Sequence, residues 1–107
     1  MTERAKPYIT HEEHLHAHLQ DAAFAVEYLN AALEDEEPDV FLLALRDVVQ
    51  ARGGFTELAR RTGLNREQLY RTLSQRGNPR FHNLETILRS LGLHLAIQVN
   101  EGQSVEA

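Results

Sequence analysis

The stretch that decides the fold reads Phe55-Thr-Glu-Leu-Ala-Arg-Arg-Thr-Gly-Leu-Asn-Arg-Glu-Gln-Leu-Tyr-Arg-Thr-Leu-Ser74. Its apolar residues recur at the spacing of two short helices that a glycine separates. Two helices that cross steeply over a three-residue turn need a small residue where their backbones approach, and a turn residue that tolerates positive φ. The pattern therefore predicts a helix-turn-helix, in which the structural positions are Leu58, Ala59, Gly63, Leu64, Leu69 and Leu73.

The second helix of this pair has a polar outer face. Asn65 and Gln68 form a capping box that starts the helix and leaves its N-terminal end exposed, and the helix should run to about Gln75. The side chains on that face can reach base edges or phosphates, which predicts DNA binding by Asn65, Arg66, Glu67, Tyr70, Arg71 and Ser74. The competing interpretation is a helical hairpin that serves only as core. Thr62 departs from the pattern, because an apolar residue is more usual just before the glycine.

The rest of the chain predicts three more helices and one strand. Thr10 and Glu13 form a capping box that opens a helix ending near Asp35. A second helix starts at Pro38 and stops at Gly53-Gly54, and a last one is capped by Asn83 and ends at Gly92. Apolar residues then alternate with others from Leu93 to Val99, which predicts a half-buried strand. The expected fold is mostly α, with five helices and a short C-terminal β-strand.

Charge divides the chain into two parts. Residues 1–48 contain three basic and eleven acidic residues, a balance of −8, whereas residues 49–107 contain eight arginines and five acidic residues, a balance of +3. An acidic part joined to a basic part suggests two different partners, with phosphate expected at the basic one. The predicted organisation is an acidic N-terminal helical arm (1–37), a helix-turn-helix DNA-binding domain with the strand (38–99) and a frayed tail (100–107).

Several function classes are disfavoured. The chain has no cysteine, which excludes disulfides and thiolate metal sites. It has no apolar run long enough to span a bilayer and no secretory signal, so we expect a cytoplasmic protein without membrane contact. No catalytic constellation or phosphate loop stands out, which argues against an enzyme or a cofactor. The histidines at 11, 14, 16 and 18 could hold zinc or nickel, but the pattern of catalytic zinc helices is absent, and a solvent-facing polar stripe is favoured over a metal site.

Five segments together resemble the addiction-module antidote family, the Cro/C1-type antitoxins encoded beside RelE-like toxins. They are Glu57 to Ser74, Gly77-Asn-Pro-Arg-Phe81, Leu88 to Leu93, Ala25 to Leu33 and Asp35 to Pro38. The similarity covers about Asp21 to Val99, and Gly77-Asn-Pro-Arg-Phe81 is its most distinctive part. The resemblance implies a protein that neutralises a RelE-like toxin by direct binding and represses its own operon.

Further expectations concern assembly. A single helix-turn-helix touches few base pairs, so operator binding favours a homodimer. The strand from Leu93 to Val99 must pair with its symmetry mate or with the edge of a toxin sheet. The toxin is expected at the acidic rim of Glu27, Glu34 and Asp35. The apolar seam from Leu15 to Leu33 fits either the domain core or the toxin interface.

Two other functions compete with an antitoxin. One is a stand-alone helix-turn-helix regulator without a toxin partner. The other is a structural or metal-buffering module that uses the N-terminal histidines and never touches DNA. A toxin-like reading frame beside the gene would favour the antitoxin. A salt-dependent gel shift would exclude the structural or metal-buffering module that does not bind DNA.

Overall fold

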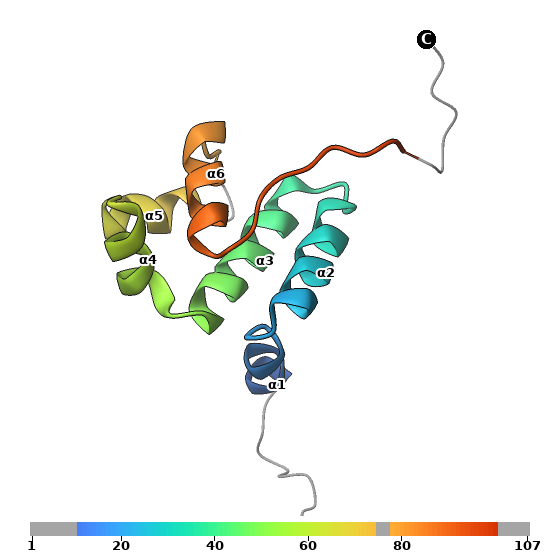
Figure 1. Cartoon of the computed structure of the whole chain (residues 1–107), viewed down its shortest axis with the longest axis horizontal. Helices are drawn as coiled ribbons and strands as arrows, with labels where there is room; N and C mark the ends of the chain where they lie inside the picture. The colour runs from blue at the N-terminus through green and yellow to red at the C-terminus, as the bar shows by residue number, and fades with distance from the viewer. Residues whose placement is uncertain (1–10, 75–77, 101–107) are drawn as a thin grey trace, which may run out of the picture.

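The computed structural model describes residues 11–74 and 78–100, with side chains from Glu13 onward. The mostly α class is confirmed, and within these residues no helix is both long and apolar enough to cross a membrane. Six helices follow one another along the described chain (Figure 1): α1 (His11–His18), α2 (Ala22–Leu33), α3 (Pro38–Ala51), α4 (Gly54–Thr62), α5 (Arg66–Thr72) and α6 (Phe81–Ser90).

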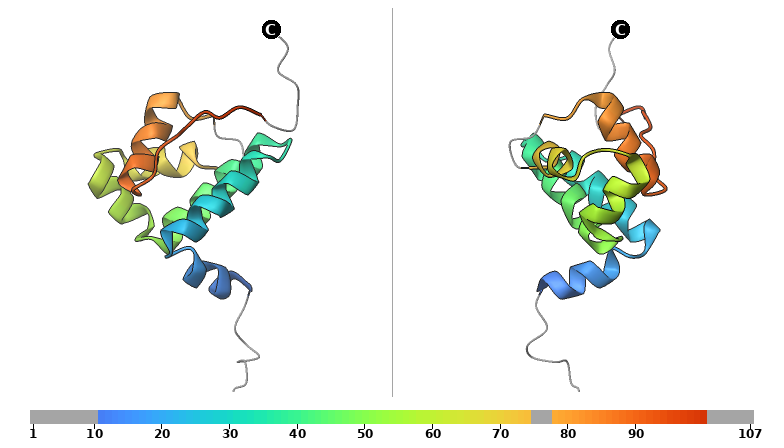
Figure 2. Two further views of the ribbon diagram at one scale, coloured as in Figure 1. Left: turned by 45° about the vertical axis from the view of Figure 1, so that its right-hand side comes forward. Right: turned by 90° about the vertical axis from the view of Figure 1, so that its left-hand side faces the viewer.

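Helix α3 is the centre of the packing. It contacts α1, α2 and α4, while α4 in turn contacts α5 and α6, and the two views of Figure 2 show α2 and α3 lying side by side. Leu45 and Val48 of α3 are fully buried. One apolar cluster runs from Leu19 and α2 through to α6, so the acidic N-terminal part and the basic part share a core: Leu19, Ala25, Leu29, Phe41, Leu42, Leu45, Val48, Val49, Phe55, Leu58, Leu69, Leu73, Ile87, Leu88 and Leu91.

The prediction of five helices is wrong, because the first expected helix is broken after His18. Leu19 is buried at 1% exposure, and the Gln20 side chain donates from Nε2 to the carbonyl oxygen of Ala51 at 3.0 Å. Asp21 then has an extended backbone, with φ −84° and ψ 124°, and is the N-cap of α2. Tertiary contacts with α3 therefore override the continuous apolar seam. The expected cap at Thr10 lies outside the described residues.

Two predicted helix ends are also displaced. The last helix begins at Phe81, with Arg80 as an extended N-cap, before the predicted cap at Asn83. Pro79 lies just before this N-cap, where its missing N–H costs no helical hydrogen bond, and Asn83 falls in the first turn of the helix. The fifth helix ends at Thr72, earlier than the expected Gln75, which lies outside the described residues.

The segment after α6 is not a strand in the single chain. Its last backbone hydrogen bond within the described residues runs from the N–H of Leu93 to the carbonyl of Leu88 at 2.9 Å. The segment then runs past α3 towards the end of α2 (Figure 1). A strand needs a neighbouring backbone to hydrogen-bond with, and the described chain places none beside it. The frayed tail expected beyond Asn100 lies outside the described residues.

Candidate functional site

The turn between α4 and α5 is set by Gly63. Its φ of 76° lies in the left-handed region, and its N–H donates to the carbonyl of Ala59 at 2.9 Å. Glycine adopts this conformation without the steric cost that a Cβ would bring. On either side, Leu58 and Leu69 are buried, so apolar contacts hold α5 against α4. The remaining expected structural positions are buried or half-buried: Ala59, Leu64 and Leu73.

Thr62 completes the turn in a way that its sequence position did not suggest. Its hydroxyl donates to the carbonyl of Leu58 at 2.8 Å and accepts the N–H of Leu64 at 3.1 Å. One side chain therefore gives the Leu58 carbonyl, near the end of α4, a second hydrogen bond and satisfies a donor in the turn that has no helical partner. The departure from an apolar residue has a structural reason. A Ser or Thr hydroxyl two residues before a turn N–H is the sequence signal that points to it.

Asn65 starts α5 as predicted. Its side-chain oxygen accepts from the backbone N–H groups of Glu67 and Gln68, at 2.8 and 3.2 Å. This confirms the predicted cap, and it orients the amide so that the NH2 group is the part left for other contacts. Asn65 is itself exposed.

Tyr70 links the outer face of α5 to the core. Its ring stacks on buried Phe55, with ring centroids 4.2 Å apart and planes 14° apart. The guanidinium of Arg66 also lies over the Tyr70 ring, with its Cζ 5.6 Å from the centroid. Tyr70 is still 36% exposed, so part of this side chain remains at the surface. The stack and the cation–π contact order both exposed side chains.

Glu57 holds two of the arginines on α4. Arg60 and Arg61 both donate to its carboxylate, from Nε at 3.0 and 2.9 Å. Hydrogen bonds from Arg60 and then Arg61 lower the pKa of Glu57 to about 2. Arg61 also donates to the carbonyl of Ser90 at 3.3 Å, which ties α4 to the end of α6. These two cations are thus partly neutralised within the protein.

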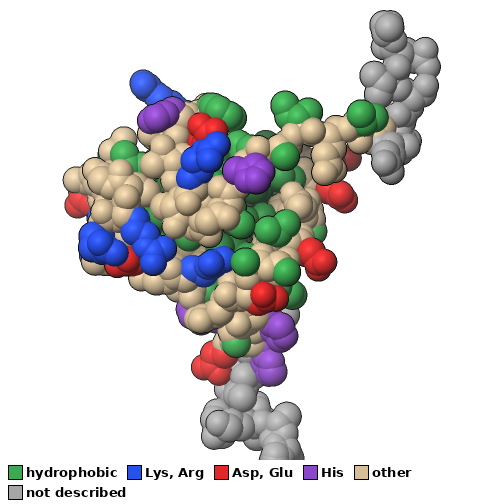
Figure 3. All heavy atoms as spheres, in the orientation of Figure 1, with side chains coloured by type: hydrophobic (Ala, Val, Ile, Leu, Met, Phe, Trp, Pro, Cys, Tyr) green, Lys and Arg blue, Asp and Glu red, His purple; other side chains and the backbone are tan. Residues whose placement is uncertain are grey.

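Three other arginines remain available. Arg66, Arg71 and Arg80 are exposed, and among the described residues no carboxylate forms an ion pair with them. Arg89, by comparison, pairs with Glu85 at 3.5 Å. Figure 3 shows most of the Lys and Arg side chains of this face over the half built by α4 to α6.

The other residues predicted for DNA contact differ in accessibility. Glu67 is exposed beside Arg66 in the first turn of α5. Ser74 is half-buried, and its hydroxyl donates to the carbonyl of Arg71 at 2.9 Å. The structure thus brings five of the six predicted side chains to the surface of one helix and its cap.

The predicted partner surface lies on α2 and the turn after it. Glu27, Glu34 and Asp35 are all exposed. Figure 3 shows several acidic side chains over the half of this face that α2 builds. Asp35 also has a local role, because its Oδ1 accepts the N–H of Glu37 at 2.8 Å just before α3 begins.

The seam on α2 divides between core and surface. Leu29 is 5% exposed, whereas Val26 and Leu33 are 41% and 52% exposed. The phenol of Tyr28 donates to Asp47 of α3 at 2.6 Å, and burial together with this carboxylate raises its pKa above the ordinary value. Helix α2 is therefore fixed on α3 through one face and presents apolar side chains on another.

Three of the four N-terminal histidines have described side chains on α1. His14, His16 and His18 are exposed, with a hydrogen bond between His18 Nδ1 and the carbonyl of His14 at 2.9 Å. The ring of His18 also lies 5.2 Å from that of Phe24. Within the described ranges, no three His, Cys, Asp or Glu side chains lie close enough together to hold a metal ion.

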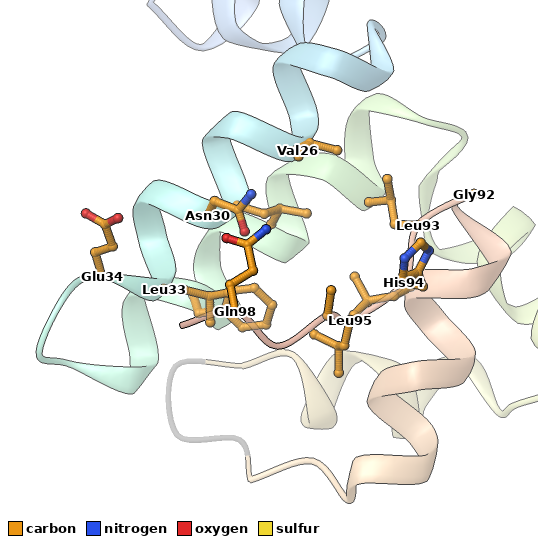
Figure 4. Close-up of a pocket in the computed structure, with 13 residues that line it drawn as sticks. Val26, Asn30, Leu33, Glu34, Gly92, Leu93, His94, Leu95 and Gln98 are labelled. Carbon is orange, nitrogen blue, oxygen red and sulfur yellow. The ribbon is translucent and has the colours of Figure 1, made fainter. Parts of the chain in front are cut away.

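A groove of about 650 Å³ lies between α2 and the segment after α6. Figure 4 shows Val26, Asn30 and Leu33 on the side of α2, facing Leu93 and Leu95 across the groove. Leu93 and Leu95 are half-buried against the core, whereas Ile97 and Val99 are 100% and 75% exposed.

Comparison with known proteins places the chain in a family. The family model described as "Probable addiction module antidote protein" matches residues 10–99. An uncharacterized protein of Haemophilus influenzae is 34% identical over 98 residues, which cover 92% of this chain and 95% of that protein. No solved structure matches significantly. The chain therefore belongs to the family of probable addiction module antidote proteins.

Proposed function

We propose that this protein is the antitoxin of a type II toxin–antitoxin module, which binds and neutralises a RelE-like toxin and represses its own operon. It acts by binding and catalyses no reaction. Helices α4 and α5 form a Cro/C1-type helix-turn-helix, and α5 is the recognition helix. Membership of the antidote family supports the antitoxin role in general terms.

One observation carries the DNA-binding part of this proposal. The exposed face of α5 offers Arg66 and Arg71 without carboxylate partners among the described residues, on a helix that Asn65 caps and Leu69 anchors. Arginine side chains that no acid neutralises are the groups that bind phosphates and guanine edges. On α4, by contrast, Glu57 partly neutralises the positive charge of Arg60 and Arg61. Of these two helices, α5 therefore carries the positive charge that is free to bind phosphate.

The test is a titration of the DNA upstream of the gene with Arg66→Ala and Arg71→Ala. Each variant should lose about 1–3 kcal/mol of binding free energy if it contacts a base, and a phosphate contact should instead reduce the salt dependence. Arg89→Ala is the matched control, because it removes the same charge from an arginine paired with Glu85. Unchanged binding by the double variant would exclude α5 as the recognition helix.

The toxin-binding part rests on charge. The resemblance to antitoxins of RelE-like toxins implies a toxin that acts on RNA, which is expected to be basic. The acidic rim of Glu27, Glu34 and Asp35 is exposed. Opposite electrostatic fields speed association and disfavour wrong partners. Apolar side chains beside the rim, Val26 and Leu33, supply contact area of the kind that gives affinity.

Co-expression with the product of the neighbouring gene tests this second part. Once the toxin is captured, binding kinetics should show a lower association rate constant for the triple variant Glu27→Gln, Glu34→Gln and Asp35→Asn. The amide oxygen introduced at position 35 can still accept the N–H of Glu37. Glu85→Gln on α6 is the control for the loss of an acidic charge. If the neighbouring product is never captured, the protein is a regulator that acts without a toxin.

A further inference from the structure

The segment after α6 has the properties of a strand that lacks its partner. From His94 to Val99 no backbone hydrogen bond joins it to another described residue. Its exposure alternates, with Leu93 and Leu95 half-buried and His94 and Ala96 exposed. Ile97 and Val99 continue the apolar face but are 100% and 75% exposed. The apolar side chains at positions 93, 95, 97 and 99 thus form one stripe, in which the first two are half-buried and the last two are exposed.

We infer that a second copy of this chain supplies the partner, through an antiparallel pairing of residues 93–99 about a twofold axis at Ala96. In this register Leu93 lies opposite Val99 of the second copy, and Leu95 lies opposite its Ile97. The exposed Ile97 and Val99 of each copy then lie beside the half-buried Leu95 and Leu93 of the other. Each contact occurs twice, as a twofold interface requires.

Charge agrees with this choice of partner. Residues 93–99 contain no Asp, Glu, Lys or Arg, so a second copy brings no like charges together. On the opposite face of the ribbon His94 lies opposite Gln98 of the second copy, a pair of polar groups. An occupant chosen by charge would instead bind at Glu34, the acidic residue in the lining of the groove.

The groove gives the ribbon support that two strands alone do not have. A two-stranded ribbon is marginal in water unless it packs on something else. Here the stripe borders a groove of about 650 Å³ whose far wall includes Val26 and Leu33 of α2. The apolar side chains of the second copy can cover this wall, in which these two residues are 41% and 52% exposed.

The ribbon deepens the proposed function, on which its role in DNA binding depends. Residue 93 lies just beyond the end of α6, and α6 packs on α4 of the helix-turn-helix. Pairing at 93–99 therefore relates two copies of α5 by the same twofold axis, as two half-sites of one operator require. The interface itself can be tested without DNA.

Single cysteines test the register, since the natural chain contains none. Ala96→Cys places two thiols opposite each other on the axis, where paired Cα atoms are about 4.5–5.5 Å apart, within the range of a disulfide. Gln98→Cys is the matched control, because in this register it faces residue 94 of the second copy. After mild oxidation of the full-length protein, a denaturing, non-reducing gel should show a covalent dimer for Ala96→Cys and a single chain without a cross-link for Gln98→Cys.

Any other pattern overturns the inference. Cross-linking of both variants indicates a parallel pairing or random collisions, and cross-linking of neither indicates that the segments do not meet. A covalent dimer of Ala96→Cys that fails to bind DNA refutes the proposed DNA-binding function and leaves the interface intact. The two failures are therefore distinguishable.

A charge placed on the exposed half of the stripe gives an independent test of the dimer. Ile97→Lys has no buried contact to lose in the single chain, so its thermal stability at high dilution should stay unchanged. In the dimer it would face Leu95, and sedimentation should show a monomer. The wild type and the control Gln50→Lys, which places the same charge at an exposed position of α3 outside the groove, should be dimers. A wild-type chain that is monomeric alone, but loses the toxin when Ile97 is replaced, would show that the toxin occupies this edge and would overturn the inference.

Discussion

The ring of Tyr70 stacks on the ring of Phe55, with centroids 4.2 Å apart and planes 14° apart. Phe55 is 3% exposed and belongs to α4, whereas Tyr70 is 36% exposed and belongs to α5. The contact therefore joins the core to the face that we propose reads DNA. It also means that Tyr70 has two separable parts, a ring that packs and a hydroxyl that can serve binding.

Replacing Tyr70 separates these two parts. Tyr70→Phe keeps the stack, so its melting temperature should match the wild type, while its affinity for the upstream DNA should fall. Tyr70→Ala loses the stack as well, and its free energy of unfolding should fall by at least the roughly 0.5–1.5 kcal/mol that such aromatic pairs contribute. Thermal melts and DNA titrations measure the two effects. A Tyr70→Phe variant that binds DNA normally would assign Tyr70 to packing alone.

Gly63→Val should destabilise the chain through backbone strain. Gly63 has φ 76°, and a Cβ at this position would meet no atom within 4 Å, so steric contact with neighbours adds nothing. A β-branched residue forced into this region costs about 1–3 kcal/mol. Gly63→Asn is the control, because asparagine tolerates the left-handed region better. Equal melting temperatures of the valine and asparagine variants would contradict this explanation.

The helix ends at Gly63 and Asn65, which depend on neighbouring residues, were predicted correctly from the sequence, whereas features that depend on distant contacts were not. Gly63 and Asn65 act through their own backbone and the next turn, so their roles follow from residue type and position. The break at Leu19 to Asp21 depends on the contact of Gln20 with Ala51, which is distant in sequence. The stacking of Tyr70 on Phe55 likewise depends on how α4 and α5 cross, and no periodicity within one helix reports that angle.

Thr62→Val should destabilise the turn although it makes the sequence look more usual. The substitution preserves shape, but it removes the acceptor of the Leu64 N–H and the donor to the Leu58 carbonyl. Loss of such a hydrogen bond costs about 1 kcal/mol when a group is left unsatisfied. Thr62→Ser keeps the hydroxyl and is the matched control. Denaturant unfolding of both variants measures the difference, and a stabilised valine variant would refute this role of the hydroxyl.

Stability should depend on the ionisation of Glu57 at acid pH. Hydrogen bonds from Arg60 and Arg61 lower its pKa to about 2 in the folded protein, from an ordinary 4.5. A carboxyl with a lowered pKa stabilises the fold above its unfolded pKa, and this contribution is lost as the pH falls from about 4.5 through about 2.

The comparison that isolates this contribution is between the wild type and Glu57→Gln. The difference between their melting temperatures should be constant above pH 4.5 and shrink towards pH 2. Added salt should reduce it, because the ion pairs lie near the surface. Glu85→Gln, which removes the pairing with Arg89 at 3.5 Å, is the control for the loss of one acidic charge from an exposed helix pair. A pH-independent difference would refute the Glu57 explanation.

Two leucines of α2 decide how far this helix belongs to the core. Leu29 is 5% exposed and lies in the apolar cluster with α3, so Leu29→Ala should cost about 2–5 kcal/mol. Leu33, one turn later, is 52% exposed, and Leu33→Ala should change the free energy of unfolding by only about 0.5 kcal/mol. The two substitutions remove the same atoms from the same helix, so burial is the main difference between them. Denaturant unfolding of the isolated protein measures both values. Equal, small losses would mean that α2 is an arm that docks weakly on α3, and the acidic part of the chain would then be separable from the part that we propose binds DNA.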